Sequence, residues 1–437
     1  MSQISSLQHS SLDEVPFGRF HLRITAMTFG ANFSDGYALG IIGALLPILT
    51  TKWVLSGFEQ GMLASSALIG LFFGSMVLGR VGDIIGRQRV YVLNFILIAV
   101  ASLLQLWAPG LWVLFVLRVL IGFGLGADYA VGPTLQSEFA PRKQRGFMLA
   151  SLTVLWTVGY VVANVLGVLL VGTGDAWRWL LASGAIPAIV VLLVRIGAPE
   201  SPGWLISRGR VEEARAIVRK HLGVELTDAE LVTSVGENAS NDYRRLFVKG
   251  QAKRTWFGVV FYSALVLPYF AIYTFVPTIF ENLKIQDANL QYIILNFFLL
   301  VGGIAGLWLV QRYSRRAATF WSFVVLAVSL LVLGLTSGMP AFVLMIPFAV
   351  YTFVMSAASN LTQVYPPELF PTPIRSSGVG LLNGLSRIAS AAGTFLLPLM
   401  LTGWGIAASM YVLAAVLAVG AVFTWWWAPE TSKNHLV

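Results

Sequence analysis

Long apolar segments recur along this sequence, and each can cross a membrane as a helix. Spanning the hydrocarbon core of a bilayer takes about 20 mostly apolar residues. The chain has twelve such segments, at about 23–50, 59–78, 90–108, 111–138, 147–171, 178–197, 256–280, 289–310, 318–337, 340–364, 377–402 and 405–427. In lipid every backbone hydrogen bond must be satisfied internally, which segments of this length achieve as helices. We therefore expect an all-α membrane protein with twelve transmembrane helices.

The composition supports the same conclusion. Hydrophobic residues make up 57% of the chain and charged residues only 11%, whereas soluble domains carry about 25% charged residues. The net charge of +9 could suggest nucleic-acid binding. The basic residues, however, lie in the loops between apolar segments, where they orient a membrane protein. We expect a lipid bilayer as the partner and no nucleic acid.

The apolar segments fall into two groups of six. We expect five regions: 1–22, a cytoplasmic N-terminal tail without the apolar core of a signal peptide; 23–197, a six-helix bundle; 198–254, a cytoplasmic loop with amphipathic helices; 255–427, a second six-helix bundle; and 428–437, a cytoplasmic C-terminal tail. With both termini inside, the outer loops hold only Lys52, Arg178 and Lys284. That asymmetry favours cytoplasmic termini in a plasma membrane, with a bacterial inner membrane as the expected location.

The loop between the two groups contains a helical pattern. Val211, Ala214, Val218 and Leu222 recur at near-helical spacing. Acidic residues lie in the first turn of this segment and basic residues in the last turn, which complements a helix dipole. We expect an amphipathic helix on the inner membrane surface or against the ends of the spans. A structural latch is the simpler interpretation, and recruitment of a partner is the alternative.

Two charged motifs lie at the inner ends of the spans. Residues 79–89 read GRVGDIIGRQR, a turn in which Asp83 can cap a helix or pair with an arginine. The fourth span of each half ends in the same pattern of Glu, Pro and Arg, at Glu138, Pro141 and Arg145 and again at Glu368, Pro371 and Arg375. Matching loops in two halves indicate parallel structural repeats with a substrate site between them.

These residues resemble the signatures of the major facilitator superfamily. The 79–89 turn matches its G-R-x-G-D-x-x-G-R-x-R motif, and Arg118 with Gly122, Gly124 and Gly126 resembles its fourth-span pattern. The sugar-porter and organic-ion branch is indicated by the following segments: 177–179, 199–205, 209–210, 366–371 and 429–431. Asp128-Tyr129 resembles phosphate and metabolite proton symporters, 35–37 resembles aromatic-acid symporters, and 386–388 resembles niacin-type carriers. The resemblance implies two pseudo-symmetric six-helix bundles.

The same resemblance implies a cytoplasmic gate of charged residues that closes the inner side. Its members here are Arg80, Asp83, Arg87, Glu138, Arg145, Glu200, Glu368 and Arg375. The second half departs from the sugar-porter pattern, with Gln311 in place of an acid and Ser314 in place of a glycine. We therefore expect a weaker latch in that half and a sugar becomes a less favoured substrate.

Three charged residues lie near the middle of their spans. Asp35 and Asp128 are carboxyl groups in spans one and four, and Arg387 lies in span eleven. Ionisable groups at this depth usually mark a transport pathway. We expect Asp35 and Asp128 to carry protons, with a permanent ion pair to an arginine as the alternative. Arg118 is ten residues from Asp128 and on a different face, so these two do not pair directly.

Arg387 gives the clearest indication of substrate, because a guanidinium offers two parallel donors to a carboxylate. A structural ion pair with Asp35 or Glu368 is the alternative. Polar and aromatic side chains complete the expected substrate site: Tyr37, Trp156, Tyr160, Asn164, Tyr269, Tyr273, Asn296, Tyr351, Asn360 and Asn383. An aromatic or heteroaromatic monocarboxylate such as nicotinate would suit this set.

The expected function is therefore proton-coupled alternating-access transport of a small organic anion by a monomer. Enzymatic chemistry has little support, because the four histidines lie outside the spans and the chain has no cysteine. We expect no catalytic residue, no cofactor and no metal. An uncoupled facilitator, a symporter of a sugar or another metabolite, and a non-transporting ligand-binding membrane protein remain as alternatives.

Overall fold

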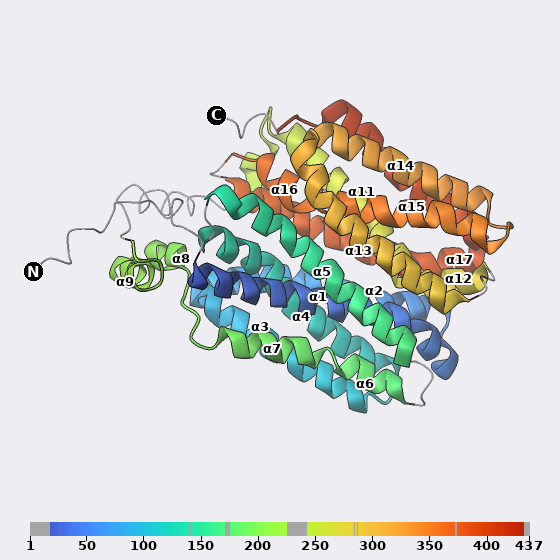
Figure 1. The fold of residues 1–437 in the computed structure, drawn as a ribbon, viewed down its shortest axis with the longest axis horizontal. Helices are drawn as coiled ribbons and strands as arrows, with labels where there is room; N and C mark the ends of the chain where they lie inside the picture. Colours follow the sequence, from blue (N-terminus) through green and yellow to red (C-terminus); the bar gives the residue numbers. More distant parts are fainter. Residues whose placement is uncertain are drawn as a thin grey trace, which may run out of the picture.

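A computed structural model of the chain describes residues 18–139, 142–170, 175–224, 243–283, 285, 287–371 and 374–431. Their regular structure is helical throughout, as expected, and the helices run roughly parallel in one elongated bundle (Figure 1). We call the end of the bundle that carries α8 and α9 the α9 end, and the opposite end the far end.

The first half of the bundle lies below the second in Figure 1. It consists of α1 (Arg19–Trp53), α2 (Gly57–Ile85), α3 (Arg87–Leu104) with the short 3₁₀ turn η2 (Gln105–Trp107), α4 (Leu111–Phe139), α5 (Arg142–Leu170), α6 (Ala176–Ala182) and α7 (Ala185–Arg195). The pair α6 and α7 forms one span, broken at Ser183 and Gly184. Six spans therefore make up this half.

The second half contains two further broken spans. It consists of α11 (Ala252–Thr274), α12 (Val276–Asn282), α13 (Ala288–Arg312), α14 (Arg315–Leu335), α15 (Ala341–Ser359), α16 (Leu361–Glu368) and α17 (Arg375–Trp427), with the 3₁₀ turn η3 (Tyr243–Phe247) before them. The first span is interrupted at Phe275, and the fourth at Asn360. Interrupted helices of this kind commonly lie beside the binding site of a transporter.

Eleven helices of the described residues are long and apolar enough to cross a membrane. The predicted twelfth span is contained in α17, whose 53 residues would extend about 80 Å if straight. Its backbone leaves the helical region at Gly405, where φ is 80° and ψ is 175°. This reversal divides α17 into two spans, as the sequence predicts.

Close contact between helix backbones depends on glycines that the sequence pattern singles out. A Cβ atom at Gly122 of α4 would lie 1.9 Å from the backbone oxygen of Ala67 on α2. Gly70 and Gly74 of α2 meet the backbone of α4 in the same way. Any larger side chain there would push α2 and α4 apart. These glycines therefore let α2 and α4 approach each other closely.

The amphipathic helix predicted in the central loop is present as α9 (Val211–Leu222), next to α8 (Pro202–Ser207). Ala214 and Val218 are fully buried in a small apolar cluster with α8 residues. The ring of His221 stacks on Phe20 of α1 at 4.7 Å between centroids. The helix therefore packs against the first turn of α1, which agrees with a structural latch.

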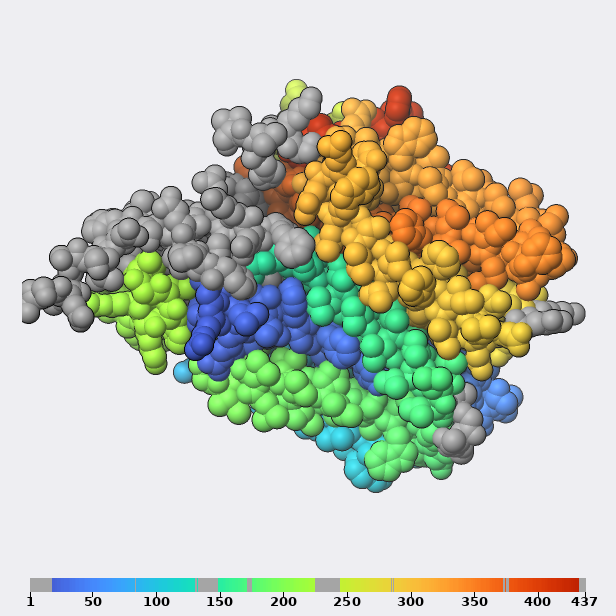
Figure 2. All heavy atoms as spheres, in the orientation of Figure 1, coloured from blue at the N-terminus to red at the C-terminus, as the bar shows by residue number. Residues whose placement is uncertain are grey.

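The two halves meet along α5 and α13, which lie side by side at the boundary in Figure 2. Near the far end, α2 contacts α17 closely, since a Cβ atom at Gly61 would lie 2.2 Å from the backbone oxygen of Phe395. Phe58 and Phe395 also pack edge to face at 5.3 Å. The two halves are therefore in direct contact at the far end.

Candidate functional site

The two intramembrane carboxyl groups lie together. Asp35 comes from the middle of α1 and Asp128 from α4, both almost completely buried, and their side chains are within hydrogen-bonding range of each other. Gly36 fixes this part of α1 against α5, because a Cβ atom there would lie 1.9 Å from the backbone oxygen of Trp156. The sequence indicates each aspartate separately, and the fold makes them a pair.

Arg387 lies beside this pair, at the interface of the two halves. It projects from α17 with 4% of its surface exposed, and its guanidinium lies 4.6 Å from the ring centroid of Tyr129 on α4 and 5.9 Å from that of Phe270 on α11. It is close enough to Asp35 for an electrostatic interaction. Within the described part of the chain no ion pair under 4 Å includes Arg387, and its Nε atom has no hydrogen-bond partner.

These contacts bear on the alternative assignment of Arg387. Glu368 is paired with Arg315 instead, at 3.2 Å, and Asp35 faces Asp128. Burying a cation without a close anion costs free energy, and binding of an anion would offset that cost. The guanidinium of Arg387 is thus placed to receive an anionic group between a ring of each half.

Aromatic side chains from both halves form a continuous cluster next to Arg387. Trp156 and Tyr160 of α5 stack at 5.4 Å between centroids. Trp156 lies 5.9 Å from Tyr269 of α11, and Tyr160 lies 6.4 Å from Tyr273. Tyr273 in turn lies 6.2 Å from Tyr351 of α15. The structure therefore brings together all five of these predicted site residues.

Polar atoms without partners are concentrated in the same region. The amide of Asn164 on α5 donates to the side-chain oxygen of Asn296 on α13 at 3.0 Å, across the two halves. Five buried polar atoms of the cluster have no hydrogen-bond partner: Trp156 Nε1, Asn164 Oδ1 and the hydroxyl oxygens of Tyr273, Tyr292 and Tyr351. Buried polar groups are rarely left unpaired in a finished interior, so these atoms mark a polar region at the interface of the two halves.

The structure places two predicted site residues differently, Asn360 and Tyr37, while the role of Asn383 stays a prediction. Asn360 donates to the backbone oxygens of Gly303 at 3.0 Å and Ser356 at 3.3 Å, and so joins α15 to α13 at a helix break. Asn383 is half-buried on α17. Tyr37 is turned away from the cluster altogether.

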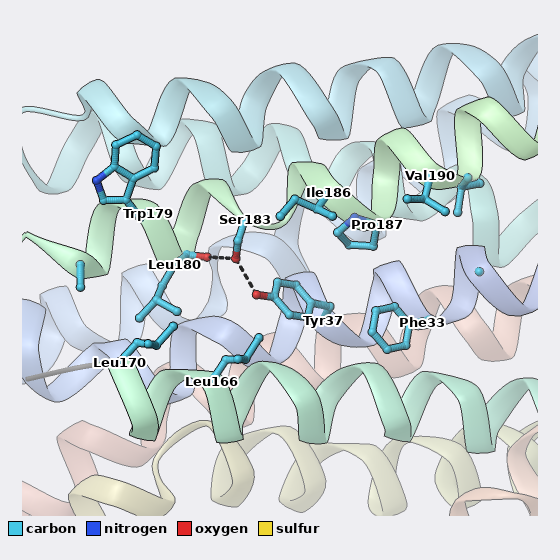
Figure 3. A pocket seen from close by; sticks show the side chains of 13 residues that line it. Phe33, Tyr37, Leu166, Leu170, Trp179, Leu180, Ser183, Ile186, Pro187 and Val190 are labelled. Carbon is cyan, nitrogen blue, oxygen red and sulfur yellow. Dashed lines mark hydrogen bonds between the residues drawn. The ribbon is translucent and has the colours of Figure 1, made fainter. Parts of the chain in front are cut away.

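Tyr37 points into a groove on the outer side of the first half (Figure 3). Its hydroxyl is 2.5 Å from Oγ of Ser183, at the break between α6 and α7. The groove has a volume of about 600 Å³ and apolar walls from α1, α5, α6 and α7. Residues two apart on a helix point about 200° apart, so Asp35 and Tyr37 cannot face the same space. Tyr37 is therefore not part of the central cluster.

Carboxylates also hold the helix ends at the α9 end of the bundle. Glu200 accepts from the backbone N–H of Gln88 at 3.0 Å, in the first turn of α3. In the second half Glu430 accepts from the backbone N–H of Arg315 at 3.1 Å and of Arg316 at 3.3 Å, in the first turn of α14. A carboxylate is favourable at a helix N-terminus, where the dipole is positive. The two halves thus repeat the same anchor.

The predicted gate is only partly visible. Arg87 donates to Oγ of Ser201 at 3.4 Å, whereas Arg80 is exposed. Glu368 forms a two-point pair with Arg315, a residue that the motif comparison left out of the gate. Four predicted members have side chains outside the described residues: Asp83, Glu138, Arg145 and Arg375. The second half keeps an ion pair despite Gln311 and Ser314, since Ser314 caps α14 and Arg315 supplies the charge.

Sequence reasoning also missed residues around the aspartate pair. Tyr129 follows Asp128 in the chain and forms the first-half face of the Arg387 contact. Arg195, at the end of α7, is buried near Asp128. Arg118 donates to the backbone oxygen of Ala38 at 2.8 Å and ties α4 to α1. Tyr129 could have been found as the neighbour of Asp128, whereas Arg195 looks like an ordinary basic residue at the end of a span.

A bundle of two repeated halves with buried charges between them defines a polytopic secondary transporter. Residues 24–437 match the family described as sugar (and other) transporter, and the chain belongs to this family of the major facilitator superfamily. It is accordingly a membrane transporter and not an enzyme.

Relatives of known name support the family assignment. The chain is 45% identical to the inner membrane metabolite transport protein YgcS of Escherichia coli, over 98% of this chain and 95% of that one. It is 28% identical to the niacin transporter NiaP of Acinetobacter baylyi, over 94% of this chain and 95% of that one.

Solved structures share the fold. The xylose transporter XylE of E. coli, in a partially occluded inward-open conformation, has a TM-score of 0.79 at 20% identity, with 94% of this chain and 100% of that chain covered. A second structure of XylE, described as a proton:xylose symporter, contains bound 6-bromo-6-deoxy-D-glucose. It has a TM-score of 0.77 at 22% identity, with 94% of this chain and 96% of that chain covered. At these identities the likeness concerns the fold alone.

Proposed function

We propose that this transporter carries a small organic anion, with aromatic and heteroaromatic carboxylates such as nicotinate as the leading class, in symport with protons. One observation carries the proposal. Arg387 is buried between rings of the two halves, has no ion pair under 4 Å among the described residues, and lies beside the Asp35–Asp128 pair. The niacin transporter among the relatives supports the substrate class.

The chemistry of binding follows from this arrangement. A guanidinium binds a carboxylate through two parallel hydrogen bonds, and the rings of Tyr129 and Phe270 flank the same guanidinium. The aromatic cluster of Trp156, Tyr160 and Tyr269 provides surfaces on which a flat ring can pack. A ring that bears a carboxylate satisfies both features at once.

The aspartate pair supplies the coupling. Two buried carboxyl groups within hydrogen-bonding range hold one proton between them more readily than two negative charges. A proton on the pair removes negative charge that would otherwise compete with the substrate for Arg387. Proton and anion therefore favour each other's binding, and release of one weakens the hold on the other. We place the α9 end on the cytoplasmic side, because most lysines and arginines of the loops lie there.

A neutral polyol or sugar is the second candidate substrate. The unpaired tyrosine hydroxyls and the Asn164–Asn296 pair could bind sugar hydroxyls. An uncoupled facilitator would need neither aspartate. A ligand-binding protein without transport would show binding but no uptake.

Uptake into proteoliposomes tests these possibilities. Labelled nicotinate, benzoate and xylose are supplied with and without an inward proton gradient. We expect the carboxylates to accumulate only with the gradient. Uptake of xylose without uptake of either acid would refute the anion assignment. Proton coupling would be refuted if carboxylate uptake were the same with and without the proton gradient and also unchanged in D35N and D128N.

A further inference from the structure

Arg195 is a buried cation that the transport scheme above does not use. It is the last residue of α7 and only 1% of its surface is exposed. Its guanidinium lies 3.2 Å from the ring centroid of Tyr91 on α3, and its Nη1 donates to the side-chain oxygen of Gln88 at 2.9 Å. Nε and Nη2 have no hydrogen-bond partner. Such a charge is costly unless anions nearby offset it.

Two carboxyl groups lie within electrostatic range of Arg195. One is Asp128, deep in the bundle, and the other is Glu200, at the α9 end. Arg195 forms an ion pair under 4 Å with neither of them in the described part of the chain. Arg195 therefore interacts with both the proton site and Glu200, which holds the first turn of α3, but it is not paired closely with either.

Tyr91 connects Arg195 to the proton site. A Cβ atom at Gly132, one turn after Asp128, would lie 2.9 Å from the hydroxyl of Tyr91 and 2.8 Å from Oδ1 of Asp128. Both of these oxygens are buried without a hydrogen-bond partner. The hydroxyl of Tyr91 and Oδ1 of Asp128 thus lie on the same side of Gly132 without a hydrogen bond between them. The guanidinium of Arg195 lies over the ring of the same tyrosine.

Gln88 connects Arg195 to the other carboxylate. Its side chain accepts from Arg195, and its backbone N–H donates to Glu200 at 3.0 Å. Three other charged groups of the adjoining elements are engaged elsewhere. Arg23 of α1 donates to the backbone oxygen of Ile196 at 2.5 Å, Arg87 of α3 donates to Ser201, and Asp35 faces Asp128.

We propose that Arg195 is a positioning residue that transmits the protonation state of Asp128 to Glu200, and so to the α3 end of the cytoplasmic gate. The inference rests on the proposed proton coupling. When Asp128 is ionised, it shares the positive charge of Arg195 with Glu200. When Asp128 takes a proton, Glu200 alone attracts Arg195 and competes less firmly for the backbone N–H of Gln88. Loading the proton site therefore loosens the anchor of α3.

Infrared difference spectroscopy of the purified full-length protein tests the first link. Protonated carboxyl groups give a carbonyl-stretch band, and its loss in D128N assigns the contribution of Asp128. In R195M we expect the pH at which this contribution is half lost to rise by about one unit, because a neighbouring cation favours the ionised form. R195K should restore most of the wild-type value. An unchanged value in R195M would overturn the proposal.

R178M is the matched control for R195M. Arg178 also lies over an aromatic ring, at 4.7 Å from Trp177, and also donates to a neighbouring element, the backbone oxygen of Leu106 at 2.5 Å. It lies at the far end, away from Asp128. R178M should leave the band at its wild-type pH. A shift as large as that of R195M would mean that loss of any stacked arginine perturbs the site, and would overturn the specific role of Arg195.

Distances between the halves at the α9 end test the second link. The chain has no cysteine, so spin labels can be attached at S207C and Y313C alone, both exposed positions. We expect the distance distribution to change with pH across the Asp128 transition in the wild type and to lose that response in R195M. E200Q should lose the response as well, and its infrared band should titrate at a lower pH, because Arg195 then has only Asp128 as a neighbouring carboxyl group. A full pH response in R195M and E200Q would overturn the proposal.

These measurements separate the inference from the proposed function. If D128N has no effect on the band and wild-type uptake ignores the proton gradient, proton coupling itself has failed. If D128N and the gradient behave as proposed but R195M resembles the wild type, only the role of Arg195 has failed.

Discussion

At the scale of single residues, the site depends on groups that the fold leaves without partners. Arg387 has aromatic rings on either side but no close anion among the described residues. Asp35 and Asp128 face each other, each with one buried oxygen that has no partner. A protein interior normally avoids such arrangements. Their presence beside the interface of the two halves supports the proposed site for a charged substrate and a proton.

Replacement of Arg387 tests the assignment of the anion site. R387K keeps the charge but loses the planar fork, and R387Q loses both. Hydrogen bonds to a charged group contribute about 1.5–3 kcal/mol, so we expect the Kd for nicotinate to rise by about 10- to 100-fold in R387Q and less in R387K.

The control for this measurement is R312K, which changes an exposed arginine at the end of α13. Calorimetric titration of nicotinate into the wild type and the three variants gives the four dissociation constants. Equal affinity in the wild type and R387Q would exclude Arg387 from the binding site.

At the scale of elements, the sequence predicts what depends on local pattern. Hydrophobic length predicts the spans, and near-helical spacing of apolar residues predicts α9. It does not predict that Asp35 and Asp128 meet, because this depends on how α1 and α4 pack. For Tyr37 the sequence suggests a contact that the fold does not make. Tyr37 is two residues from Asp35 in the chain, which suggests a shared site, but on the helix its side chain points the other way, into the groove of Figure 3.

The contact of α2 with α4 can be tested by adding one methyl group. In G122A the new Cβ atom would lie 1.9 Å from the backbone oxygen of Ala67. Overpacking of this kind costs about 1–3 kcal/mol, so thermal unfolding in detergent should occur at a clearly lower temperature.

G380A is the matched control within a span. A Cβ atom at Gly380 of α17 has no heavy atom within 4 Å, and alanine favours a helix over glycine by about 0.5–1 kcal/mol. Its unfolding temperature should be unchanged or higher. Equal loss of stability in G122A and G380A would contradict the close approach of α2 and α4.

The docking of α9 should depend on pH through His221. Partial burial, together with Lys220 and Arg23, holds the pKa of His221 below its ordinary value of 6.5. The docked state thus binds the proton less readily than the undocked state. Docking is fully favourable above pH 6.5 and weakens as the pH falls through the lowered pKa.

A fluorophore on A216C, an exposed position of α9, can report this change through its mobility. We expect mobility to increase as the pH falls below 6.5 in the protein with His221. In H221F the stacking ring remains but cannot titrate, so mobility should stay constant. The same pH dependence in H221F would show that another group controls α9.

At the scale of the whole molecule, two repeated halves share one interface. The anchors Glu200 and Glu430 occupy equivalent helix ends in the two halves. The aromatic cluster and the Asn164–Asn296 hydrogen bond cross the interface. The repeat of Glu, Pro and Arg in the sequence predicts the halves, but Arg315 and Glu430 complete the second-half anchor through contacts that no motif spacing reveals.

The hydrogen bond between Asn164 and Asn296 offers a direct measure of coupling between the halves. Side-chain hydrogen bonds within membrane proteins average about 0.6 kcal/mol in double-mutant cycles. We expect N164A, N296A and the double variant to give an interaction of that order in thermal or chemical unfolding. Strictly additive effects of the two single variants would show that the asparagines do not interact.

The central claim is that the Asp35–Asp128 pair couples anion movement to protons, and one comparison tests it most directly. Proteoliposomes containing the wild type or the D35N/D128N variant are assayed for gradient-driven accumulation of nicotinate and for exchange of nicotinate at equal pH. We predict that the variant keeps exchange, which needs Arg387 but no net proton movement, and loses accumulation. Accumulation at the wild-type level in the variant would contradict the account.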